Sequence, residues 1–114
     1  IAVTFTNSTN TAVSGVEFEI AGNVERVGSV GPGDTVTRRM RSVPGYDVPQ
    51  IRSGLQVAYV DAHGVRHDEN AQVYMQGMGY RGHINVRYDG STNLGFTGTA
   101  TLSIIQYFID SYNL

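Results

Sequence analysis

The chain has 114 residues and a formal net charge of −2, and 40% of its residues are hydrophobic while only 16% are charged. This length corresponds to one domain over residues 1–114, and the composition excludes a highly charged, disordered chain. The sequence contains no cysteine and no lysine, which excludes disulfide frameworks, thiolate metal sites and Schiff-base chemistry. No apolar run approaches the roughly 20 residues of a membrane span, and the charge balance gives no general attraction to nucleic acid.

Short runs of alternating character follow one another along the chain. Apolar side chains occupy every second position within residues 1–5, 16–20, 55–59, 73–75 and 84–88. A period of two puts one set of side chains on a core face and the other set in solvent. Because β-branched and aromatic residues are frequent in these runs, the pattern predicts strands in antiparallel sheets with one wet face each.

Turn signals separate these runs. Residues 31–34 (Gly-Pro-Gly-Asp) predict a turn before a Thr- and Arg-rich strand at 35–41, and residues 61–64 (Asp-Ala-His-Gly) predict a hairpin. Residues 42–50 contain two prolines and predict a loop with no regular ladder. Several short strands at this spacing indicate a β-sandwich.

The C-terminal segment fits two patterns. Ile105, Phe108, Ile109 and Tyr112 recur at the helical period, and Ser103 precedes them as a candidate N-cap. The same segment also alternates as a last strand would. We expect a strand up to about Ser103, and helix and strand are both open for residues 103–113.

Four stretches share the pattern of a known family. Residues 3–7 read Val-x-Phe-x-Asn, residues 16–18 read Val-x-Phe, residues 27–35 read Val-Gly-x-Val-x-Pro-Gly-Asp-Thr, and residues 60–64 read Val-Asp-x-x-Gly. This pattern resembles small bacterial immunoglobulin-like modules. The resemblance implies an exported binding or accessory domain and brings no catalytic residue with it. We therefore expect a single-domain, all-β, antiparallel immunoglobulin-like β-sandwich, with a short C-terminal helix as one alternative for its end.

Residues 77–82 (Gly-Met-Gly-Tyr-Arg-Gly) match the letters of the dinucleotide-binding fingerprint. That site requires a helix after the third glycine and an acidic residue about 20 positions further on. Residues 83–88 alternate as a strand instead, and the acidic residue is missing. We expect a flexible loop whose Met78 and Tyr80 are exposed and available to a partner.

Histidines and carboxylates gather at the predicted hairpin. Asp61, His63 and His67 supply ligand types that a divalent transition metal accepts, and His83 is a distant candidate for a further ligand. The alternative is a solvated hairpin tip in which Asp61 shapes the turn. We favour this alternative because the sequence fixes no third ligand at a suitable spacing.

A second polar cluster consists of arginines. Alternation places Arg39 and Arg41 on one side of the strand at 35–41 and Arg38 on the other. Two guanidinium groups on one side can bind a carboxylate or phosphate. We favour the alternative of a solvated edge strand, where charges discourage aggregation.

The function that we expect is recognition of a protein partner by a non-enzymatic module without a cofactor. Tyrosine gives large, rigid contact areas and is frequent in recognition surfaces. The candidate partner-binding residues are Tyr46, Met78, Tyr80, Arg81, Phe108 and Tyr112. We expect an inhibitor, immunity or accessory protein in the periplasm or outside the cell.

Three other functions stay open. The chain can be a self-associating structural subunit of a surface assembly, whose apolar C-terminal tail packs on a neighbouring copy. It can also be a metal-dependent enzyme or a carbohydrate- or lipid-binding domain. The start at Ile1 fits either removal of a signal peptide or a trimmed chain.

Overall fold

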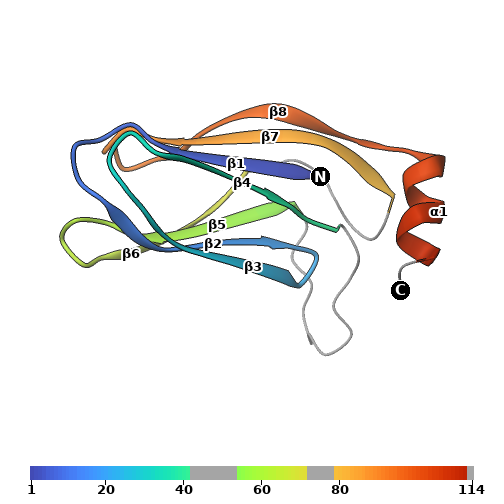
Figure 1. Ribbon diagram of the computed structural model, residues 1–114, viewed down its shortest axis with the longest axis horizontal. Coiled ribbons are helices and arrows are strands. Elements are labelled where there is room, and N and C mark those ends of the chain that lie inside the picture. The colour runs from blue at the N-terminus through green and yellow to red at the C-terminus, as the bar shows by residue number, and fades with distance from the viewer. Residues whose placement is uncertain (42–53, 72–78, 113–114) are drawn as a thin grey trace.

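The computed structural model of the protein describes residues 1–41, 54–71 and 79–112 (Figure 1). Its elements are β1 (Ala2–Asn7), β2 (Val13–Ile20), β3 (Asn23–Val30), β4 (Thr35–Arg39), β5 (Leu55–Val60), β6 (Arg66–Asn70), β7 (Tyr80–Tyr88), β8 (Gly95–Leu102) and α1 (Ile104–Tyr112). The predicted β-rich architecture is confirmed. The loop expected at 42–50 and the strand expected at 73–75 lie outside the described residues.

The strands form two four-stranded sheets, in the orders β4-β1-β7-β8 and β3-β2-β5-β6. Strands β2 and β3, β5 and β6, and β7 and β8 are antiparallel neighbours along the chain. Strand β1 is antiparallel to β4 but parallel to β7. The expectation of purely antiparallel sheets is therefore wrong at this pair. Because β1 and β7 are far apart in sequence, no hairpin sets their relative direction.

The two sheets lie face to face and share one hydrophobic core (Figure 1). In β1, Val3 and Phe5 are fully buried, while the alternate residues Thr4 and Thr6 are only partly covered. The ring of Phe5 lies 6.5 Å from the ring of Phe18 in β2, which belongs to the other sheet. The predicted period of two thus places one apolar row from each sheet in the shared core.

The predicted turns at 31–34 and 61–64 connect β3 to β4 and β5 to β6. In the first turn the Asp34 N–H donates to the Gly31 carbonyl over 3.1 Å, and in the second the Gly64 N–H donates to the Asp61 carbonyl over 3.0 Å. The second turn is a hairpin, since β5 and β6 pair in register from Val60–Arg66 to Gln56–Asn70. Both turn predictions are confirmed.

The C-terminal segment is a helix, and β8 ends at Leu102 as expected. Ser103 is its N-cap, because its Oγ accepts the Gln106 N–H over 3.3 Å and its carbonyl accepts the Tyr107 N–H over 2.9 Å. One turn further on, Gln106 Nε2 donates to the Asp110 carboxylate over 2.9 Å. These local bonds favour the helix over the competing strand.

Candidate functional site

Helix α1 turns a polar side toward the domain and apolar side chains toward solvent. Its one buried residue is Asp110, which is 3% exposed. We call the exposed large residues of the helix its apolar face: Ile104, Ile105, Tyr107, Phe108, Ile109 and Tyr112. A surface helix normally buries its apolar stripe against the core, so this reversed orientation leaves a hydrophobic surface available to a partner.

Polar contacts hold α1 in this orientation. The Asp110 carboxylate accepts the Gly79 N–H over 2.9 Å, and the Gly79 carbonyl accepts the Ser103 N–H over 2.7 Å. Gly79 directly precedes β7, so both ends of the helix are fixed to one point of the first sheet. A guanidinium nitrogen of Arg41 lies 3.5 Å from the Asp110 carbonyl oxygen. The helix is therefore anchored by hydrogen bonds rather than by burial of its apolar residues.

Asp110 is a helix-anchoring residue of the candidate site that the sequence analysis did not identify. Ser103, Gln106 and Asp110 recur at i, i+3 and i+7, which is a polar stripe at the helical period. That stripe was readable in the sequence, but the periodicity does not say which stripe of the helix faces the domain. Within the described part of the chain, no helix is long and apolar enough to cross a membrane.

The structure separates the candidate partner-binding residues. Phe108 and Tyr112 are exposed on the apolar face of α1, and Arg81 is exposed on β7. Tyr80 is only 8% exposed, because it begins β7 on its core-facing side, opposite Leu102 of β8. The exposure predicted for Tyr80 is therefore wrong. Tyr46 and Met78 lie outside the described residues.

The glycines of the 77–82 segment that the structure describes serve close packing. Strand β7 begins at Tyr80, so the expectation of a strand rather than a helix is confirmed, but the loop expected at 77–82 is wrong for residues 80–82, which are already strand. A Cβ on Gly79 would lie 3.0 Å from the Tyr107 Cβ of α1, and a Cβ on Gly82 would lie 2.0 Å from the Thr99 carbonyl oxygen of β8. These two glycines let β7 approach its neighbours closely.

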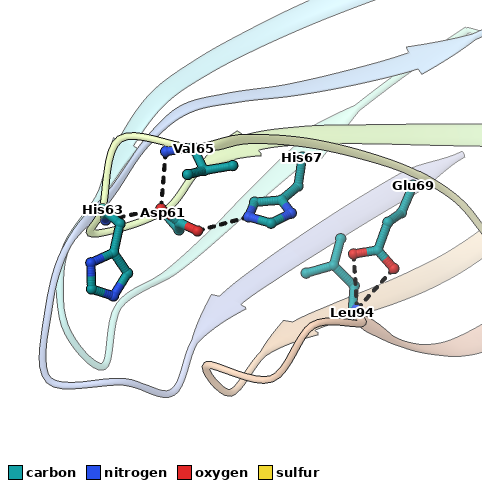
Figure 2. A network of polar contacts seen from close by, with 6 residues as sticks. All are labelled: Asp61, His63, Val65, His67, Glu69 and Leu94. Atoms are coloured by element: carbon teal, nitrogen blue, oxygen red, sulfur yellow. Dashed lines mark hydrogen bonds and ion pairs between the residues drawn. The ribbon is translucent and has the colours of Figure 1, made fainter.

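The hairpin cluster is a turn-stabilising network (Figure 2). One carboxylate oxygen of Asp61 accepts the backbone N–H groups of His63 and Val65 over 2.9 and 3.0 Å, and the other lies 2.7 Å from His67 Nε2. His63 thus contributes its backbone, and Figure 2 shows its ring pointing away from the carboxylate. In the described ranges no three histidine, aspartate or glutamate side chains converge as a metal site. The distant candidate His83 lies in the other sheet, with Nε2 2.7 Å from the Thr4 hydroxyl.

Residues next to this network also connect the two sheets. The His67 ring stacks on Tyr59 at a centroid distance of 4.8 Å, and burial, with a contribution from Glu69, raises the pKa of Tyr59 to about 12. Glu69 of β6 accepts the Leu94 N–H over 3.0 and 3.1 Å, just before β8 (Figure 2). Because β6 and β8 belong to different sheets, this contact ties the two layers together. The arrangement explains Asp61 and His67 as stabilising residues.

Asp61 is expected to make stability depend on pH. The His67 hydrogen bond, followed by the Val65 N–H, lowers the pKa of the Asp61 carboxyl. A carboxyl with a lowered folded-state pKa stabilises the fold above its unfolded pKa of about 3.9 and loses this contribution as the pH falls through the folded value. Denaturant unfolding should show a stability gap between the native chain and Asp61→Asn at pH 5 that narrows below about pH 4. A gap independent of pH would contradict this assignment.

The two candidate anion-binding arginines have different surroundings. Arg39 is exposed at the end of β4 and pairs in register with Ala2 of β1. Arg41 lies beyond β4 and approaches the C-terminal half of α1. Arg38, predicted on the opposite side, forms an ion pair with Glu25 of β3 at 3.5 Å. Arg41 therefore adds to the contacts that hold α1.

Comparisons with known proteins assign no family to the chain. No protein-family model matches the sequence, and no curated protein matches it. Among solved structures, the chain is similar to a protein from Eubacterium rectale determined by NMR, with 12% sequence identity and a TM-score of 0.48. That similarity covers 89% of this chain and 85% of the other chain.

Proposed function

We propose that this protein is a non-enzymatic binding module that recognises a protein partner through the apolar face of α1. The observation that supports the proposal is the reversed helix, whose buried side is polar and whose apolar side chains are exposed. Exposed apolar patches of this kind mark interaction surfaces. Aromatic residues, which are enriched at the centres of interfaces, form half of this face: Tyr107, Phe108 and Tyr112.

The rest of the fold supports such a role by presenting the helix on a rigid body. The helix follows β8 at one end of the two packed sheets (Figure 1), and the Asp110–Gly79 hydrogen bond fixes its direction. A binding element held in a defined orientation loses less conformational entropy when a partner docks. Orientation of the helix and affinity for the partner are therefore linked.

The proposal includes an immunoglobulin-like relationship in the layout of two packed sheets and a location in the periplasm or outside the cell. The sequence resemblance described above supports both. The strand order, however, differs from that of constant-type immunoglobulin domains. In those domains the first two strands lie in one sheet, whereas β1 and β2 lie in different sheets here. Fractionation of the source cells tests the location.

Capture of partners from an extract of the source organism tests the docking surface. We expect the native chain to retain a protein that an Ile105→Asp, Phe108→Asp double variant retains at least tenfold less, because two central apolar anchors are worth more than about 1.4 kcal/mol. A Val24→Asp, Val65→Asp double variant is the matched control. Its two valines are also exposed, at 47% and 51%, but lie in β3 and in the turn that precedes β6.

The control variant should retain the partner as the native chain does. Both double variants should unfold at nearly the native temperature, since neither removes a buried residue. Equal retention of the same proteins by all three baits would exclude the apolar face of α1 as the docking surface. A self-associating subunit, the second candidate function, uses the same surface.

A further inference from the structure

The described strands leave four sheet edges, and one of them differs from the others. The edge strands are β4 and β8 in the first sheet and β3 and β6 in the second. An edge presents unpaired backbone N–H and C=O groups, and proteins protect it with charges, prolines or bulges. Three edges have charged side chains: Arg38 and Arg39 in β4, Glu25 and Arg26 in β3, and Arg66, Asp68 and Glu69 in β6. Strand β8 (Gly95–Leu102) has neither a charge nor a proline.

Strand β8 is also continuously paired along its inner side. It pairs with β7 in continuous register from Tyr80–Leu102 to Arg87–Gly95. Phe96 and Ala100 pack against the core, while the exposed residues between and beyond them include Thr97, Thr99 and Thr101. Threonine favours strands, and threonine pairs across strands are stabilising. The unpaired edge of β8, with threonines on its solvent-facing surface, therefore suits the addition of a further strand.

The absence of charge in β8 favours a second copy of the chain over an unrelated strand. About a two-fold axis at Thr99 between two antiparallel β8 strands, Thr99 faces its own copy and Thr97 of each copy faces Thr101 of the other. At β3, β4 or β6 such pairing would place charged side chains in the seam, where they lose part of their hydration. At β8 it brings threonines and small residues together. This edge is thus complementary to itself.

The area next to β8 is sufficient for a stable dimer. Leu102 at the end of β8 is 69% exposed, and the apolar face of α1 begins two residues later. With roughly 200 Å² available per fully exposed large side chain, these seven residues present on the order of 900 Å². A stable interface covers about 800 Å² on each partner.

We propose that two copies of this chain associate about a two-fold axis by antiparallel pairing of β8 with β8, and that the same interface covers the apolar face of α1. The two four-stranded sheets β4-β1-β7-β8 then form one continuous sheet. This inference rests on the proposed function and names the protein partner as a second copy.

Sedimentation equilibrium of the full chain tests the inference. We expect a concentration-dependent dimer whose dissociation constant rises at least tenfold in a Thr97→Lys, Thr101→Lys double variant. The matched control is Thr35→Lys with Thr37→Lys, because both of these threonines are exposed on β4, the other edge of the same sheet. The control variant should dimerise as the native chain does.

Spin labels report the geometry independently of affinity, since the chain has no cysteine of its own. Labels on Thr99→Cys should give a short distance between copies. Labels on Thr37→Cys lie three strand spacings further from the seam in each copy, so their separation should be greater by roughly 30 Å. Equal distances for the two sites would overturn the β8 seam.

The remaining outcomes separate this inference from the proposed function. A native chain that is monomeric at every concentration, or a dimer that the β8 lysines leave unchanged, overturns the inference. If that monomer still binds another protein and loses it in the Ile105→Asp, Phe108→Asp variant, the proposed function stands without it. If the monomer binds no protein through α1, both fail.

Discussion

Replacement of Gly82 by alanine is expected to lower the free energy of unfolding by about 3 kcal/mol. The new Cβ would lie 2.0 Å from the Thr99 carbonyl oxygen and 3.0 Å from the Ala100 Cα. Both are backbone atoms of β8, so neither can rotate away, and the two strands must separate. The φ of Gly82 is also +146°, in the region that alanine rarely adopts. Urea-induced unfolding measures the loss.

The matched control is Gly28→Ala in β3. Gly28 has a φ of +87°, but an added Cβ would meet nothing within 4 Å. This variant has the backbone strain without the collision, and we expect a loss of about 1 kcal/mol. If Gly82→Ala were no more destabilising than Gly28→Ala, the close approach of β7 and β8 would not be what requires glycine.

Replacement of Asp110 by alanine is expected to release α1 from the domain and to destabilise the protein by about 2 kcal/mol. The variant leaves the Gly79 N–H without its acceptor and removes the partner of the Gln106 amide. The apolar face contributes little to retention of the helix, because its side chains are exposed. Hydrogen exchange should become much faster at the amides of residues 104–112, while the core strands keep their protection.

Asp110→Asn is the control for this effect. The asparagine oxygen can still accept the Gly79 N–H, and the Gln106 amide can turn to present its own oxygen to the new NH2 group. We expect this variant to keep most of the protection of α1. Fast exchange in both variants would show that the charge rather than the hydrogen bond holds the helix, and unchanged exchange in both would show that Asp110 is not the anchor.

Much of the local structure was predictable because it depends on neighbouring residues. Alternation identified β1, β2, β5 and β7, since the period of two is a property of a strand with one buried face. Turn residues located the connections at 31–34 and 61–64 because glycine, proline and aspartate adopt turn geometry irrespective of the rest of the chain. Ser103 indicated the start of α1 in the same way, through its cap.

Part of the candidate site was also within reach of the sequence. The alternation of residues 84–88, extended backwards, places Tyr80 on the core face together with Ile84. The polar stripe of Gln106 and Asp110 was equally readable. In both cases the pattern divides the residues into two sets but does not say which set faces the domain. The exposure of Tyr80 was therefore predicted wrongly, and the role of Asp110 was not identified.

Local sequence patterns were sufficient to predict most of the described strands, the turns at 31–34 and 61–64, and a strand rather than a dinucleotide-binding helix at residues 83–88. Contacts between remote segments set the parallel direction of β1 and β7, the contact of Asp61 with His67, and the orientation of α1 with Asp110 toward the domain. The physical reason is distance along the chain. Periodicity and turn preference act within a few residues, whereas the direction of β1, the stacking of Tyr59 on His67 and the acceptor for the Gly79 N–H depend on which remote segments meet. The exposed apolar face of α1 follows from that last contact.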